Sequence, residues 1–308
     1  MQALKYKSEK LKSVGYGLAS CGELAQGYIN NQPFLVNLPI DYSTAIIIDA
    51  SMSSKNFSSN GLAISKIRKF EKLLAERILP RDLAKSFHTS INIINPIPRG
   101  KGMASSTAEM VAFYHAFINF CERQFNLSRS ELKLEPDELS ELIVMVEPTD
   151  GLYFPGISLI NHLTGICSKS YVNLPKLSVL IIDEGGEIDT VGNSRSKAKI
   201  VADQNQNEMK EILKLIEDGF KNKNPKKLCK AATISSIVQQ NVRKNIYFDS
   251  LKELIGDEIL GVNCAHSGVI LGVLFEPHHL KKVLKKVSEV IPQKLILGSF
   301  DIKCGGMF

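Results

Sequence analysis

The stretch that most constrains this fold is a glycine-containing loop that leads directly into a long helical pattern. It reads PIPRGKGMASSTA over residues 96–108. Pro96 and Pro98 prevent a regular element from continuing into the loop, and no further proline or glycine follows Gly102 until Pro136. An alternating pattern at 86–94 predicts a strand before the loop, and a helix is predicted from Ser105 to about Phe125. The chain must therefore place a permissive backbone at a helix N-terminus.

Such a loop can bind phosphate. Gly100 and Gly102 tolerate positive φ and allow a ligand to approach the backbone closely. The free N–H groups of the first helical turn and the helix dipole attract anions, Lys101 adds a positive charge, and the hydroxyls can donate to phosphate or bind magnesium. The residues alone also allow a turn with a serine N-cap. The spacing excludes a P-loop and a dinucleotide fingerprint, because Gly-Lys-Ser/Thr and the third glycine are missing.

Composition sets the class of protein. A chain of 308 residues with 44% hydrophobic and 23% charged residues predicts a globular protein of two domains. The net charge of +6 is mild, and the lysine-rich run at 221–227 has no interleaved aromatics, so we expect no nucleic-acid partner. The six cysteines have no CxxC spacing, and no signal peptide or membrane-length apolar run is visible. We expect a reduced, cytoplasmic protein with no membrane partner.

Strands and helices are mixed without steady βαβ alternation, which favours an α+β fold over a doubly wound sheet. Residues 15–50 are predicted as β structure, in two apolar stretches separated by PIDY at 39–42. Further strands are expected at 176–184, 267–276 and 293–302. Helices are expected at 62–78, 136–146, 207–220, 225–240 and 280–291.

Four stretches together resemble a known family. The loop at 96–108 resembles the P-x-x-x-G-x-G-L-G-S-S-A motif of the GHMP small-molecule kinases, and within them the L-threonine kinases of cobalamin biosynthesis. SCGELAQG at 20–27, VEPTDG at 146–151 and CAHSGVILGVLF at 264–275 resemble the other motifs of that subfamily. The resemblance thus covers nearly the whole chain. The chain departs from the wider superfamily at Met103 and Ala104. It matches loosely at 188–196 and in the stretch 264–275, which resembles the third motif of the superfamily.

The resemblance implies a two-domain fold, with an N-terminal domain like ribosomal S5 domain 2 over residues 1–170 and a ferredoxin-like C-terminal domain over 171–308. It implies ATP and Mg²⁺ as cofactors and an active site between the domains. It also implies in-line transfer of a phosphoryl group to an amino alcohol, most like L-threonine, giving O-phospho-L-threonine. Whether the protein forms a homodimer stays open.

The resemblance, together with the residue types, suggests a set of site residues. Asp150 would accept the proton of the acceptor hydroxyl and Lys101 would assist the transfer. Ser106 and Glu147 would hold magnesium, with Glu138 and Glu141 as competitors for the role of Glu147. The acceptor would contact Glu23, Gln26, Asp41, His266 and Ser267, with Glu23 meeting an ammonium group. ATP would contact Pro98, Arg99, Gly100, Lys101, Gly102, Met103, Ala104, Ser105, Ser106 and Thr107.

Two alternatives stay open. The first is a GHMP kinase for another amino alcohol, homoserine or L-serine. The second is a non-catalytic relative that binds a nucleotide or metabolite, against which the combined presence of the loop, Ser106, Glu147 and Asp150 argues.

Overall fold

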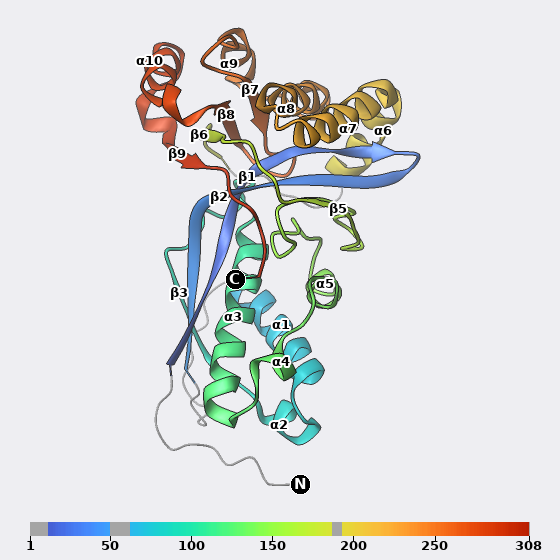
Figure 1. Cartoon of the computed structure of the whole chain (residues 1–308), viewed down its shortest axis with the longest axis vertical. Coiled ribbons are helices and arrows are strands. Elements are labelled where there is room, and N and C mark those ends of the chain that lie inside the picture. The colour runs from blue at the N-terminus through green and yellow to red at the C-terminus, as the bar shows by residue number, and fades with distance from the viewer. Residues whose placement is uncertain (1–11, 50–61, 187–192, 308) are drawn as a thin grey trace.

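The computed structural model describes residues 12–186 and 193–307 apart from 50–61, and it has an α+β fold built on two antiparallel sheets (Figure 1). The five-stranded sheet has the order β1-β2-β4-β5, with β3 paired to β2, and the four-stranded sheet has the order β7-β8-β6-β9. The expected α+β class is confirmed. The segment predicted as a motif at 188–196 lies partly outside the described residues.

A long hairpin of β1 (Lys12–Ile29) and β2 (Gln32–Asp49) organises the first sheet. Asn30 and Asn31 connect the strands with φ angles of 49° and 63°, which suits asparagine in a two-residue hairpin turn. The predicted break at PIDY is absent, because β2 runs through it as one strand. One half of β2 pairs with β3 (Ser90–Ile94), and the other half pairs with β4 (Ile157–Ile160), which in turn pairs with β5 (Cys167–Tyr171).

The hairpin bends where its register shifts three times, between Leu18 and Ala25. In Figure 1 one half of the blue hairpin lies beside α3 (Ser105–Phe125), and the other half runs beneath α6 (Asn193–Gln204), α7 (Gln206–Lys221) and α8 (Pro225–Gln240). A β-bulge re-aims the side chains around it. The bend therefore sets the direction of segment 20–27, one of the four stretches that carry the resemblance.

Helix α3 lies against β1 at a distance that only glycine permits. A Cβ atom on Gly17 would lie 2.0 Å from the carbonyl oxygen of Ala108. A phenylalanine-rich core joins α3 to its neighbours, with Phe70, Phe113, Phe117 and Phe120 almost fully buried. The neighbouring helices are α1 (Leu62–Ile78), α2 (Arg81–Ser86), α4 (Arg129–Leu132) and α5 (Pro136–Val144).

The second sheet has the connectivity of a ferredoxin-like domain. Its strands are β6 (Ser178–Asp183), β7 (Gly261–Cys264), β8 (Ile270–Phe275) and β9 (Ile296–Asp301). The helices between β6 and β7 are α6 (Asn193–Gln204), α7 (Gln206–Lys221), α8 (Pro225–Gln240) and α9 (Phe248–Glu253). Helix α10 (Leu280–Val290) connects β8 to β9. With the spatial order 7-8-6-9, this is the β-α-β-β-α-β arrangement that the resemblance implies.

Element predictions succeed where periodicity is strong. The helices predicted at 62–78 and 225–240 have those bounds. The strand predicted from residue 86 begins instead at Ser90. The N–H and hydroxyl groups of Thr89 both donate to Glu71 Oε1, at 2.9 and 2.6 Å, so this residue joins no ladder. The elements that were not predicted are mostly short, namely α2, α4, α6, α9, β4, β5 and β7.

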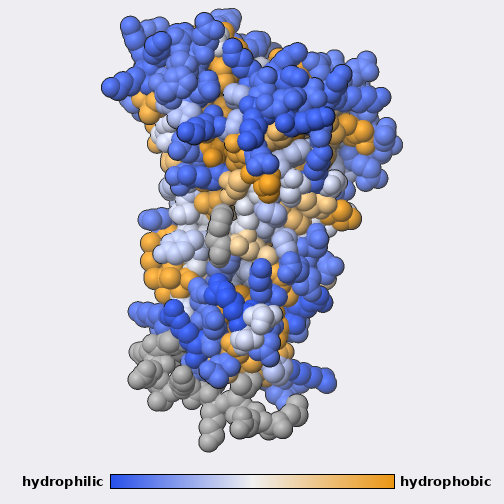
Figure 2. Space-filling view, viewed as in Figure 1, coloured by the Kyte–Doolittle hydropathy of each residue, from blue (hydrophilic) through white to orange (hydrophobic). Residues whose placement is uncertain are grey.

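The end of the chain returns to the first sheet. Ile302 forms a bridge with Ile40, and Gly305 forms one with Gly156. The boundary expected between two domains after residue 170 stays a prediction, and strand β5 runs across that position. Figure 2 shows mainly hydrophilic side chains over the upper end of the molecule, and hydrophobic side chains among paler ones around its middle. Among the described helices, none combines the length and apolarity that a membrane crossing requires.

Candidate active site

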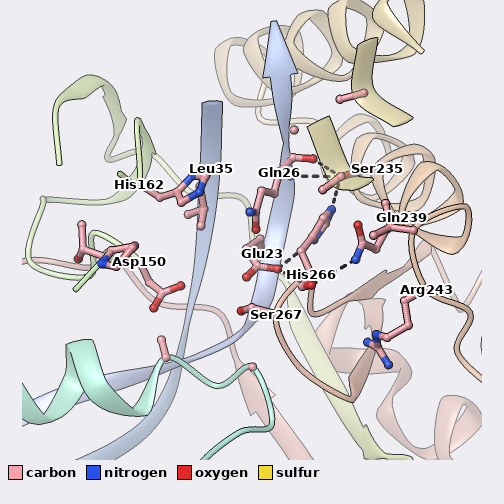
Figure 3. A pocket seen from close by; sticks show the side chains of 18 of the residues that line it. Glu23, Gln26, Leu35, Asp150, His162, Ser235, Gln239, Arg243, His266 and Ser267 are labelled. Atoms are coloured by element: carbon pink, nitrogen blue, oxygen red, sulfur yellow. Dashed lines mark hydrogen bonds and ion pairs between the residues drawn. The ribbon is translucent and has the colours of Figure 1, made fainter. Parts of the chain in front are cut away.

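A cavity of about 470 Å³ lies where the bent hairpin, the glycine loop and the α6–α8 layer meet (Figure 3). That size is in the range of small-molecule sites. Its wall brings together predicted residues from four motifs that are far apart in sequence. They are Glu23, Gln26, Gly100, Gly102, Met103, Ala104, Ser105, Ser106, Thr107, Glu147, Asp150, His266 and Ser267.

The glycine loop is fixed through its carbonyl groups. Met103 O accepts from Ser20 N at 3.1 Å and Gly102 O accepts from Gly22 N at 3.0 Å. Lys101 O accepts from the N–H groups at the start of β8. Gly102 has φ 87°, and a Cβ atom there would lie 2.2 Å from Ala265 Cβ. The loop is thus pressed against the third motif, which leaves no room for a side chain at Gly102.

The first turn of α3 is open to an anion. The residue before the helix is Ala104, with φ 56°, and no side chain caps the helix. The alternative of a turn with a serine N-cap is therefore not what forms here. Ser105, Ser106 and Thr107 all line the cavity. Their first-turn N–H groups have no intrahelical acceptor, which is the arrangement that binds phosphate.

Asp150 lies beside this helix start. Thr107 Oγ1 donates to Asp150 Oδ2 at 3.3 Å. Burial, and then the charges of Glu23 and Glu147, raise the pKa of Asp150 to about 7, while the hydrogen bond from Thr107 lowers it. A carboxyl group with a pKa near the working pH can take and release a proton there.

Glu147 fits a metal ligand better than its two competitors. Its Oε1 atom is buried and has no hydrogen-bond partner among the described residues, while Oε2 lies 2.5 Å from Lys66 Nζ. Glu138 instead accepts from the Glu135 N–H and from Arg77, and Glu141 is exposed. Of the three, only Glu147 lines the cavity, as Ser106 does. A hydroxyl and a carboxylate oxygen are the hard ligands that Mg²⁺ prefers.

A hydrogen-bonded chain fixes the opposite side of the cavity (Figure 3). Glu23, only 3% exposed, accepts at Oε2 from His266 N at 2.9 Å and lies 3.0 Å from His266 Nδ1. His266 Nε2 lies 3.3 Å from Ser235 Oγ, and Ser235 Oγ accepts from Gln26 N at 3.2 Å. The tautomer that satisfies this chain carries its proton on Nδ1, with Ser235 donating to Nε2. Glu23 is then an oriented carboxylate.

Four predicted residues do not line the cavity. Asp41 is 61% exposed and lies 3.4 Å from Lys303 Nζ. Pro98 lies outside the wall, and Arg99 pairs with Glu109 at 2.8 Å. Lys101 directs its ammonium group to Asp183 at 3.0 Å and to the carbonyl of Gly186 at 2.7 Å. Lys101 thus ties the loop to the end of β6.

Other cavity residues were missed by the sequence analysis. Ser235, Gln239 and Arg243 line the wall from α8 and the turn after it. Gln239 donates to His266 O, and Arg243 to Gly268 O, so both support the third motif. Ser235 and Gln239 are four residues apart and so lie on one face of α8, and Arg243 follows at the same spacing in the turn; this run of polar residues is the signal that could have found them. His162, in the turn between β4 and β5, has no comparable signal.

The segment that holds the glycine loop and Asp150 matches a kinase family. Residues 65–151 match the family model described as the GHMP kinases N terminal domain. Over this segment the chain is similar to the GHMP kinases, and it is a phosphotransferase with an alcohol acceptor, which sets aside the non-catalytic alternative.

Two L-threonine kinases are similar to this chain over most of its length. The L-threonine kinase of Citrobacter freundii is 26% identical over 264 residues, covering 84% of each chain. That of Salmonella typhimurium is 27% identical over 276 residues, covering 88% of this chain and 86% of that protein.

Solved structures share the fold at low identity. The homoserine kinase from Cytophaga hutchinsonii has a TM-score of 0.69 at 13% identity, covering 99% of both chains. MDDEF, in complex with MVAPP, AMPPCP and magnesium, has a TM-score of 0.64 at 17% identity, covering 96% of this chain and 100% of that one.

Proposed function

We propose that this protein transfers the γ-phosphoryl group of Mg·ATP to the side-chain hydroxyl of L-threonine, giving O-phospho-L-threonine. The observation that carries the proposal is that Glu23 and Asp150 share one cavity and lie close enough for the charge of Glu23 to raise the pKa of Asp150. A short amino alcohol can therefore place its ammonium group at Glu23 and its hydroxyl at Asp150. The names of the two curated relatives support threonine as that amino alcohol.

The phosphate end of the site would be the first turn of α3. The N–H groups of Ser105, Ser106 and Thr107 offer fixed donors to a triphosphate, and the helix dipole adds a favourable potential. The loop carbonyls are already bonded to β1 and β8, so little reorganisation is needed on binding. Phosphoryl transfer depends largely on such positioning and charge stabilisation.

Ser106 and Glu147 would hold the magnesium ion. The buried, unpartnered Oε1 of Glu147 supports this assignment, because a buried carboxylate oxygen without a donor is costly unless a ligand satisfies it. Magnesium bound there would neutralise charge on the transferred phosphoryl group. The MDDEF structure, with AMPPCP and magnesium, supports the same cofactor class for this fold.

Asp150 would orient the acceptor hydroxyl and accept its proton. Thr107 holds one carboxylate oxygen, Oδ2, and its hydrogen bond favours the ionised form. With a pKa of about 7, the carboxyl group is poised to take a proton at neutral pH. Lys101 was predicted to assist, but its ammonium group is bound to Asp183, so we assign it to holding the loop.

Recognition of the acceptor would begin at the Glu23 carboxylate. His266 and Ser235 hold this group in one orientation, and its burial makes an unpaired charge costly. An ammonium group is the natural partner, which favours amino alcohols over sugar alcohols.

A panel of acceptors tests the proposal directly. ADP release would be measured with L-threonine, L-serine, homoserine and a sugar alcohol, and the product identified by mass and by phosphorus NMR. We expect threonine to give the highest kcat/KM and serine to be poorer by roughly 10–200-fold, the range available to one methyl group. If homoserine gives the highest kcat/KM, the threonine assignment fails and the alternative of a kinase for another amino alcohol takes its place.

A further inference from the structure

Helix α1 docks on the segment that carries Glu147 through two lysines one turn apart. Lys66 Nζ lies 2.5 Å from Glu147 Oε2, and Lys69 Nζ donates to Met145 O at 2.5 Å. The two contacts differ in kind. Lys69 binds a neutral carbonyl group, whereas Lys66 pairs with a carboxylate that lines the cavity.

Lys66 faces a cluster of acidic groups. Glu109 is 1% exposed, and burial raises its pKa, while the charges of Arg99 and Lys66 lower it and that of Glu147 raises it. Glu147 also raises the pKa of Asp150. Arg99 pairs with Glu109, so Lys66 is the cation bound directly to Glu147. The positive charge of Lys66 therefore lies beside the same carboxylate that a divalent cation would bind.

The two oxygens of Glu147 have different surroundings. Oε2 is paired with Lys66, and Oε1 is buried without a partner among the described residues. An ion pair on one oxygen fixes the rotation of the carboxylate and so the direction of the other. Oε1 is thereby held available, while the positive charge beside it opposes a free divalent cation.

We propose that Lys66 is a positioning residue that makes this site select metal–nucleotide over free metal. The ammonium group repels a free cation of charge +2 and competes with it for the carboxylate of Glu147. It attracts the complex of a divalent cation with ATP, whose net charge is negative. Metal would then enter together with the nucleotide. The inference rests on the proposed role of Glu147 as a metal ligand.

The test measures binding and needs no turnover. Mn²⁺ would be titrated by electron paramagnetic resonance into the nucleotide-free protein, and Mg·ATP by calorimetry, for wild type and Lys66→Met. We expect Lys66→Met to bind free Mn²⁺ about tenfold more tightly, because a full charge next to the ligand has been removed. Its affinity for Mg·ATP should fall severalfold. A purely structural lysine would leave the ratio of the two affinities unchanged.

Matched variants separate the possible outcomes. Lys69→Met removes the neighbouring contact and should leave both affinities near wild type, and Lys66→Arg should preserve them. Lys66→Gln repeats the charge loss if Lys66→Met does not fold. Glu147→Gln tests the proposed metal site itself. If it leaves Mn²⁺ binding intact, the metal assignment fails. If Glu147→Gln abolishes Mn²⁺ binding while Lys66→Met and Lys66→Gln match wild type in both affinities, the metal site stands and only the proposed role of Lys66 is overturned.

Discussion

Thr107 and Asp150, 43 residues apart in sequence, exchange two hydrogen bonds: the threonine hydroxyl donates to Asp150 Oδ2 and accepts from the Asp150 N–H, both at 3.3 Å. One side chain thus fixes both the backbone and the carboxylate of Asp150. Since Thr107 lies in the first turn of α3, this contact locks the acidic group to the helix start proposed to bind phosphate.

Asp150→Asn tests the role of this carboxylate in proton transfer. Asparagine keeps the size and can still accept from Thr107, but it cannot take a proton. If Asp150 is a general base, turnover should fall by about 10²–10⁴ with little change in Mg·ATP affinity. A fall of only about tenfold would indicate that positioning dominates. Near-normal kcat with a raised threonine KM would leave Asp150 as a binding residue only. Weakened Mg·ATP binding would identify it as a metal ligand.

Thr107→Val should move the acidic limb of the pH–rate profile. The hydrogen bond from Thr107 lowers the pKa of Asp150, so its loss should raise that pKa above about 7. The base is active when deprotonated, so the limb in kcat/KM should shift to higher pH. Thr107→Ser keeps the hydroxyl and is the control. An identical limb in Thr107→Val and wild type would show that another group sets this profile.

The raised pKa of Asp150 also predicts a pH-dependent stability. Between the ordinary aspartate value of about 4 and the folded value of about 7, the folded protein holds a proton that the unfolded chain has lost. The stability contributed by this group is therefore lost as pH rises through that window. Asp150→Asn should melt about 2–4 °C above wild type at pH 8, and the difference should shrink toward pH 5. A difference that grows toward pH 5 would contradict the direction of the shift.

Ser106→Ala tests the hydroxyl proposed to bind magnesium. Ser106 lines the cavity and is not the N-cap residue, so its removal should cost little stability. We expect an unchanged melting temperature, a strongly lowered kcat and a higher magnesium concentration at half-maximal rate. Full activity at limiting and at saturating magnesium would exclude the hydroxyl as a ligand.

Glu23→Gln tests the acceptor side. Glutamine keeps the shape but loses the charge that would pair with an ammonium group. A charged hydrogen bond contributes about 1.5–3 kcal/mol, so threonine KM should rise by roughly 10–100-fold with the KM for ATP nearly unchanged. Ser235→Ala should raise threonine KM less, because it loosens only the histidine that orients Glu23. An equal loss toward both substrates would point to a collapsed cavity.

The local sequence determined the elements and much of the phosphate side of the site. Helix α3 begins at Ser105 and ends at Phe125, within the predicted bounds, because its apolar residues recur at helical spacing and no proline or glycine interrupts it. The loop at Gly100–Gly102 could be recognised because glycine and a following helix start are properties of neighbouring residues. The expected resemblance to the GHMP kinases is confirmed by the family-model match over residues 65–151, and it could be recognised because its motifs are likewise local.

Only the tertiary structure decided which side chains meet. Lys101 and Asp41 carry suitable charges at positions that the resemblance selects, yet Asp183 binds Lys101 and Lys303 lies beside Asp41, both from distant parts of the chain. Lys66 has no local sequence signal, and the polar spacing around Ser235 does not say what that residue contacts, because their roles arise from packing of α1 on the Glu147 segment and of α8 on β1. Periodicity and motif spacing report neighbours along the chain, whereas charge pairing and burial depend on neighbours in space.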